Sequence, residues 1–139
     1  MAKQFSLFLP KGANNSSITL QNADGTALKL FYTAGADDSD VDSIIVTSND
    51  TAARILVLYV TRGGVDYIIG TITVGAGAGT DGFNFSLDLL NPINFQGLPI
   101  NNVGKPYLRL KAGDTVKVAV TTAVTAAKTI YLSAFGQDY

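Results

Sequence analysis

The sequence predicts an all-β protein, an antiparallel β-sandwich of the jelly-roll type. Val, Ile, Thr, Tyr and Phe recur in short runs separated by Gly, Asn and Asp, which is typical of strands joined by tight turns. Within residues 115–121 the valines Val116, Val118 and Val120 share one face of the expected strand, the two-residue period of a sheet with one buried face. The chain has 139 residues and no cysteine, so packing or assembly must stabilise it.

The N-terminal segment differs from the remainder and leaves two interpretations open. Residues 4–9 are apolar enough for a short strand, and residues 10–17 are polar and rich in turn formers. They form either the first strand and loop of the same domain, or an arm in which Phe5, Leu7 and Leu9 dock on a neighbouring subunit. We therefore divide the chain into an N-terminal strand or arm with its linker, residues 1–27, and a sandwich domain, residues 28–139.

From residue 28 onward, strand-like runs follow one another. Residues 55–60 are apolar on both faces, which predicts a place in the middle of the sandwich or beneath a subunit contact. The expected strands are residues 28–33, 41–47, 53–61, 65–74, 83–87, 107–110, 115–121 and 128–135.

Turn residues support antiparallel pairing. Gly63-Gly64 tolerates the positive φ angles of a two-residue hairpin turn, so residues 53–61 and 65–74 are expected to pair. Residues 111–114 form another expected tight turn, and the polar residues 48–51 can bond their own backbone in a further one.

Two long connections follow the hairpin. The Gly-rich residues 75–82 lack the Gly-Lys-Ser/Thr ending of a phosphate-binding loop, and no helical pattern follows them, so we expect a flexible connection. In residues 88–104, Asp88 is expected to cap a single helical turn that Pro92 ends. Phe95, Leu98 and Ile100 are either buried against the domain's own core or contact a partner.

The chain lacks most side chains that carry out catalysis. It contains no His, Cys, Trp or Glu, and Asp supplies all 11 acidic residues. We expect no enzymatic activity and no cofactor, because no carboxylate pair stands out as an acid–base pair for glycoside hydrolysis. The formal net charge of −1 offers no basic stripe, so neither nucleic acid nor a membrane is an expected partner. Only 15% of residues are charged, which suits a surface covered by another chain.

Four aspartates lie within six residues of the sequence: Asp37, Asp38, Asp40 and Asp42. Three of them have the spacing that opens a calcium loop, but Ser43 stands where that loop needs glycine, and no Glu can close it. A solvated acidic loop is the preferred interpretation, and no metal site is assigned.

No apolar stretch reaches the ~18 residues that span a bilayer. Residues 1–10 have neither a strongly positive start nor a small-residue cleavage site. We expect the protein to be made and used without secretion.

Several segments of the chain together resemble a group of small tailed-bacteriophage virion proteins. The resemblance runs from about Leu30 to the C-terminus, in strand and turn segments rather than reactive residues. These segments are residues 30–36 (LFYTAGA), 41–54, 64–71 (GVDYIIGT), 88–90, 110–114 (LKAGD) and 134–139 (AFGQDY).

The resemblance implies a capsid decoration or cement protein that binds the major capsid protein on the outer head shell of the virion. A homotrimer on a symmetry axis would repeat its contact and gain avidity. The alternatives are a head fibre, tail or baseplate component, and a carbohydrate-binding β-sandwich module in which Tyr59, Tyr67 and Tyr107 replace the missing Trp.

Overall fold

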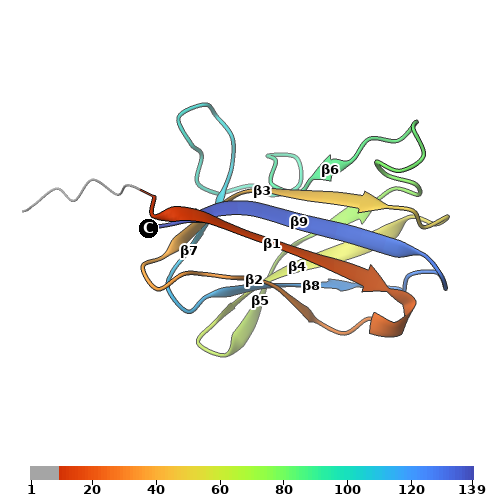
Figure 1. Cartoon of the computed structure of the whole chain (residues 1–139), viewed down its shortest axis with the longest axis horizontal. Coiled ribbons are helices and arrows are strands. Elements are labelled where there is room, and N and C mark those ends of the chain that lie inside the picture. Colours follow the sequence, from red (N-terminus) through yellow and green to blue (C-terminus); the bar gives the residue numbers. More distant parts are fainter. Residues whose placement is uncertain (1–9) are drawn as a thin grey trace, which may run out of the picture.

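The computed structural model describes residues 10–139 as two antiparallel sheets packed face to face (Figure 1). A single short 3-10 turn, η1 (Asn22–Asp24), accompanies the strands in this part of the chain. The strands are β1 (Gly12–Gln21), β2 (Lys29–Thr33), β3 (Ser39–Ser48), β4 (Arg54–Arg62), β5 (Val65–Val74), β6 (Leu87–Asp88), β7 (Leu108–Leu110), β8 (Thr115–Val120) and β9 (Thr129–Asp138).

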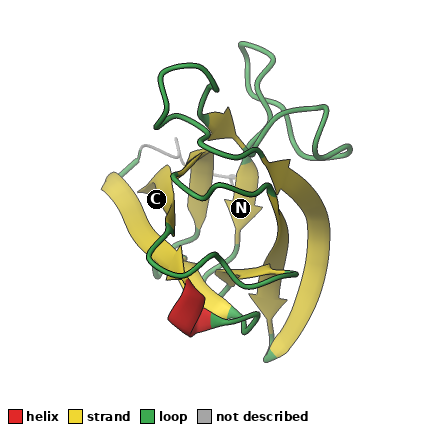
Figure 2. Ribbon diagram, turned by 90° about the vertical axis from the view of Figure 1, so that its right-hand side faces the viewer, coloured by secondary structure: helices red, strands yellow, loops and turns green. Residues whose placement is uncertain are grey.

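The strand order confirms the predicted sandwich and its jelly-roll type. One sheet has the order β1-β9-β3-β6, with β7 also pairing with β3, and the other has the order β2-β8-β4-β5. Most consecutive strands alternate between the two sheets, so the connections cross the ends of the sandwich as they do in a double Greek key. Figure 2 shows the two layers of strands and the loops that join them.

The core lies between the sheets and follows the predicted alternation. Val116 and Val118 of β8 are 0% exposed and Val120 is 3% exposed, as the two-residue period requires. On β4, Leu56 and Leu58 point inward and are each 1% exposed. Burial of such side chains, each worth about 1.5–3 kcal/mol, is the main favourable term that joins the two sheets.

Strand β1 corrects the interpretation of residues 10–17 as a linker. Residues 12–21 pair with β9 over their whole length, from Gly12 opposite Asp138 to Gln21 opposite Thr129. Their polar sequence is compatible with a strand because β1 is the edge of its sheet and only Leu20 is fully buried. Residues Phe5, Leu7 and Leu9 lie outside the described residues.

The predicted strand at residues 83–87 is also corrected. Only Leu87 and Asp88 pair with β3, and residues 83–86 belong to a loop. The β4–β5 hairpin is confirmed, with Gly63 and Gly64 at φ angles of 59° and 78° that favour glycine.

Candidate interaction surface

The most exposed large hydrophobic side chains gather in two loops, residues 75–86 and 89–107. Phe83, Phe85, Ile93 and Val103 are 88%, 90%, 92% and 81% exposed, while every other large apolar side chain among residues 10–139 is at most 64% exposed. Figures 1 and 2 both show these loops projecting from the side of the sandwich where β6 pairs with β3. We call these four residues the loop surface.

The aspartate Asp81 gives the first loop a fixed shape. Its carboxylate accepts hydrogen bonds from the backbone N–H groups of Phe83 and Asn84, each at 2.8 Å, and from the Asn84 side chain at 2.7 Å. These bonds, those of Asn84 first, lower the pKa of Asp81 below its usual value. The two phenylalanines are therefore held outward by a hydrogen-bonded turn rather than by the flexible connection that the glycines suggested.

The base of this loop is attached to the turn at residues 48–51. The Ser48 N–H donates to the Ala78 carbonyl at 2.8 Å, and the Gly77 N–H donates to the Asp50 carbonyl at 3.0 Å. Asp50 is 1% exposed and forms a buried ion pair with Arg54, with 2.8 Å between Nε and Oδ2. Burial alone would raise the pKa of Asp50, but hydrogen bonds from Arg54 and Thr125 outweigh it and hold the pKa well below its usual range.

The second loop is fixed by Asp88 and by two asparagines. Asp88 does not cap a helix as predicted; its Oδ1 accepts the N–H groups of Ile44 at 3.2 Å and Leu90 at 3.1 Å. Asn91 instead orders a turn, because its Oδ1 accepts two backbone N–H groups at 3.0 Å each, those of Ile93 and of the next residue. Further along, Asn101 Oδ1 accepts the Val103 N–H at 3.1 Å. Ile93 and Val103 are thus displayed directly beside the residues that order their backbone.

The three candidates predicted in this loop have different environments. Phe95 is 4% exposed and packs within the protein's own core, as one of the two sequence interpretations had it. Leu98 is partly buried against the same core, and Ile100 is 56% exposed. Phe95 therefore anchors the loop, and Ile100 extends the exposed apolar area.

The two loops carry very little charge. Asp81 and Lys105 are the only charged residues of the two loops, and Asp88 of β6 stands between them. Both carboxylates already accept hydrogen bonds within the molecule, and Asp88 also pairs with Lys105 at 3.0 Å. A partner that covers this edge would consequently not have to strip water from an unpaired charge.

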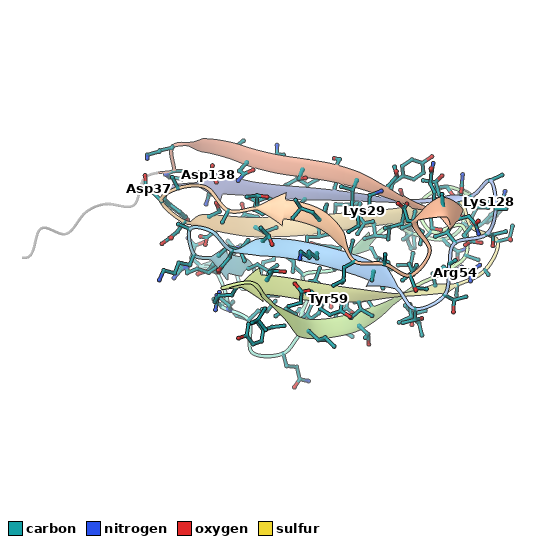
Figure 3. All side chains as sticks on the ribbon, turned by 90° about the horizontal axis from the view of Figure 1, so that it is seen from below. Lys29, Asp37, Arg54, Tyr59, Lys128 and Asp138 are labelled. Atoms are coloured by element: carbon teal, nitrogen blue, oxygen red, sulfur yellow. The ribbon has the colours of Figure 1, made fainter. Side chains whose placement is uncertain are left out.

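The opposite edge of the sandwich, formed by β1 and β2, is closed by side chains. On this edge the Asn14 amide donates to the Thr33 carbonyl at 3.1 Å, and the Ser16 hydroxyl donates to the Phe31 carbonyl. In the reverse direction the Tyr32 hydroxyl donates to the Asn14 carbonyl at 3.0 Å and Lys29 donates to the Thr19 carbonyl at 2.6 Å. Figure 3 shows Lys29 on β2, beside β1.

The aspartates of residues 37–42 are committed to separate partners. Asp37 pairs with Lys11, Asp38 accepts the Ala112 N–H at 2.7 Å, and Asp40 accepts the Tyr139 hydroxyl at 2.5 Å. In residues 10–139 no three His, Cys, Asp or Glu side chains are grouped so as to hold a metal ion. Burial, followed by repulsion from Asp40, raises the pKa of Asp42.

The tyrosines considered as a sugar platform do not share a face. Tyr67 lies opposite Val60, the neighbour of Tyr59 along β4, so Tyr59 and Tyr67 project from opposite sides of their sheet. Tyr107 has the guanidinium of Arg109 over its ring, 5.2 Å from the ring centre. These residues do not combine into one flat aromatic surface.

Sequence reasoning missed all four residues of the loop surface. Phe83 and Phe85 were placed in a strand because their alternation with Asn84 and Ser86 fits the strand period. The signal that could have identified them is the pair Asp81-Gly82, which favours a turn directly before Phe83.

Within residues 10–139 no helix is long and apolar enough to cross a membrane. No protein-family model and no curated protein sequence matches the chain.

Among solved structures, the chain is similar to one in the "Cyanophage Pam1 capsid asymmetric unit", with 12% identity and a TM-score of 0.48, over 100% of this chain and 93% of that one. It is also similar to part of the Clostridium thermocellum endo-1,4-beta-D-xylanase 10B structure, which contains CBM22-1 and GH10 modules complexed with xylohexaose. That match has 15% identity and a TM-score of 0.41 and covers 92% of this chain but 26% of the other. At these identities and TM-scores the two likenesses do not assign a function.

Proposed function

We propose that the protein is a virion structural protein of a tailed bacteriophage, of the capsid decoration or cement type. In this role it binds the major capsid protein on the outer head shell after synthesis in the host cytoplasm. It acts as a homo-oligomer, with a trimer favoured, and has no enzymatic activity. The observation that carries the proposal is the loop surface, Phe83, Phe85, Ile93 and Val103, displayed on one edge by hydrogen-bonded loops. The resemblance of residues 30–139 to phage virion proteins supplies the class of partner.

Burial of the loop surface would be a strong source of binding energy. Full burial of a side chain such as Phe or Ile is worth about 1.5–3 kcal/mol relative to leaving it exposed. The four side chains lie in a region whose two carboxylates are already hydrogen-bonded, so few polar groups would lose water without compensation.

The stiffness of the display also favours contact with another protein. Asp81, Asn91 and Asn101 order the backbone next to the exposed apolar residues before any partner binds. Binding therefore pays less conformational entropy than it would with disordered loops. A protein that clamps neighbouring coat subunits requires this stiffness, and a specific contact of about 1,600 Å² requires no catalytic residue.

The test is co-sedimentation of the full chain with purified phage heads that lack it. The double variants Phe83→Ser/Phe85→Ser and Ile93→Ser/Val103→Ser should each bind heads at least about tenfold more weakly, since loss of a contact anchor costs roughly 2 kcal/mol or more. The matched control is Leu30→Ser, which removes an apolar side chain that is 53% exposed on β2, at the opposite edge of the sandwich.

Two results would contradict the proposal. One is wild-type protein that does not sediment with heads; the other is a Leu30→Ser variant that loses as much binding as the loop variants. Sedimentation with isolated tails instead of heads would favour the tail or baseplate alternative. Binding to a glycan array with no binding to particles would favour the carbohydrate-binding alternative.

A further inference from the structure

The edge strand β5 has an unoccupied side. Its pairing with β4 runs from Arg54 opposite Val74 to Arg62 opposite Val65. Within residues 10–139 no other strand or side chain forms a hydrogen bond with the β5 backbone. A ten-residue edge strand with Asp66 as its one charged residue is a ready template for another strand.

A groove of ≈ 460 Å³ runs beside the second half of this free edge. One wall is β5 itself, at residues Thr71 to Thr73, and the other is the loop at residues 91–94. Leu87 of β6 lines it from the opposite sheet. Nearer the hairpin, Tyr67 and Ile68 are 52% and 64% exposed and project from opposite faces of the sheet. An extended segment placed here would find backbone partners along β5 and apolar neighbours on both of its faces.

The chain itself contains one further segment of suitable chemistry. Residues 4–9, Gln-Phe-Ser-Leu-Phe-Leu, are apolar, uncharged and free of proline. Phe5, Leu7 and Leu9 would share one face of an extended segment, with Phe8 on the other. We propose that this segment of one copy pairs with the free edge of β5 in a second copy and fills the groove.

Chain geometry requires the acceptor to be another copy. Residue 10 directly precedes Lys11, whose N–H donates to the Asp138 carbonyl at the outer edge of the β1 sheet. The other edge of that sheet is β6, three strand spacings away, or about 14 Å. Leu87 of the groove pairs with Val46, seven residues along β3 from Ser39, which lies opposite Asp138, so the groove is also displaced by ~23 Å along the strands. The six residues from position 10 back to position 4 extend to ~22 Å, which is less than the combined separation of ~27 Å, so residues 4–9 cannot reach the groove in their own chain while residue 10 stays at β1.

The other edge of the sandwich does not offer the same template. There, the carbonyls of Thr33 and Phe31 on β2 accept side chains of β1, and the carbonyls of Asn14 and Thr19 on β1 accept side chains of β2. A strand arriving at that edge would have to displace these bonds. Residues 4–9 are therefore expected to pair with β5 and not with the β1/β2 edge. Copies of the chain should associate in this way without any shell protein.

A complementation experiment in the full chain tests the proposal. A donor variant, Phe5→Asp/Leu7→Asp, disrupts the apolar segment, and an acceptor variant, Thr71→Lys/Thr73→Lys, places charge at two exposed positions of β5. The matched control, Ala13→Lys/Ser17→Lys, adds the same charge at exposed positions of β1. Unchanged thermal unfolding of each variant establishes that it is folded, and sedimentation equilibrium gives its association state.

We expect wild type and the β1 control to associate, and the donor and acceptor variants to be monomeric alone. An equimolar mixture of the two monomeric variants should form heterodimers. The acceptor variant retains the apolar segment at residues 4–9, and the donor variant retains the free edge of β5. Three results overturn the proposal: monomeric wild type, a mixture that stays monomeric, or a β1 control that dissociates with the acceptor variant. The measurement contains no phage particles, so its failure is distinct from a failure to bind heads.

Discussion

The two edges of the sandwich are built in opposite ways. At the β1/β2 edge, side chains of each strand donate hydrogen bonds to carbonyls of the other, so four edge carbonyls are bonded within the molecule. At the β5/β6 edge, β5 is unpaired on its outer side and the neighbouring loops display Phe83, Phe85, Ile93 and Val103. The first arrangement discourages association and the second invites it. The two edges of the sandwich therefore differ in kind, and we call the β1/β2 edge the sealed edge and the β5/β6 edge the contact edge.

The loops of the contact edge are nevertheless held by hydrogen bonds, and the base of the loop at residues 75–86 is bonded to Asp50, a member of a buried ion pair. Asp50 joins Arg54, Thr125 and the base of the loop at residues 75–86. Figure 3 shows Arg54 at the end of the sandwich opposite to Asp37 and Asp138. The hydrogen bonds of Asp50 thus give the loop at residues 75–86 a rigid base.

The largest effect is expected from removing that support. The substitution Asp50→Ala leaves Arg54 without its partner at a buried site and should lower the free energy of unfolding by about 3–5 kcal/mol. Chemical denaturation measures the loss. Amide hydrogen exchange of the variant should accelerate in residues 75–86 before it accelerates in β1 and β2.

The matched control for this prediction is Asp37→Ala. It removes an ion pair whose two side chains are 67% and 62% exposed, so it should cost at most about 1 kcal/mol. Equal losses in the two variants would contradict the special role of the Asp50 network.

The next effect concerns the sealed edge. The substitution Tyr32→Phe keeps the buried ring but removes the hydroxyl that donates to the Asn14 carbonyl at 3.0 Å. The expected cost is about 1 kcal/mol, the net worth of one hydrogen bond. Association of the full chain should not change. A variant that kept its stability but altered the association state would reverse the assignment of the two edges.

The same tyrosine makes the sealed edge sensitive to alkali. Burial, followed by the charge of Asp138, raises the pKa of Tyr32 to about 12. An unfolded tyrosine ionises near pH 10, so the unfolded state releases the proton first and stability falls as the pH rises from about 10 towards 12. Denaturation at a series of pH values should show this decline, and it should be shallower in Tyr32→Phe. An equally steep decline in that variant would contradict the assignment.

The smallest effect on stability is expected at the contact edge. The acceptor variant Thr71→Lys/Thr73→Lys changes exposed side chains that make no hydrogen bond within residues 10–139. Its free energy of unfolding, measured at a concentration where the chain is monomeric, should stay within about 0.5 kcal/mol of wild type. A loss larger than that of Tyr32→Phe would show that β5 is not a free edge.

Much of the sandwich could be predicted because its strands obey a local rule. The alternation of Val116, Val118 and Val120 and the Gly63-Gly64 turn are visible in neighbouring residues, and both predictions are confirmed. Strand β1 was missed because its polar residues are stabilised by partners far along the chain, such as Ser133 opposite Ser17. No local pattern reveals such a pairing.

The contact edge was harder to predict for a similar reason. Phe95 and Phe83 look alike in sequence, yet Phe95 is 4% exposed and Phe83 is 88% exposed. The difference depends on where Asp81 and Asn91 direct the backbone after the fold has formed. The sequence predicts that function lies in surfaces and assembly, and the structure shows which large apolar side chains are most exposed.

Electron microscopy of phage heads with the full chain bound would locate the protein and its orientation in one experiment. We expect density for the protein on the outer shell, with the loops at residues 75–86 and 89–107 buried against coat subunits and the β1/β2 edge facing solvent. Density in which the β1/β2 edge contacts the shell and the loops face solvent would contradict it, as would heads that carry none of the protein.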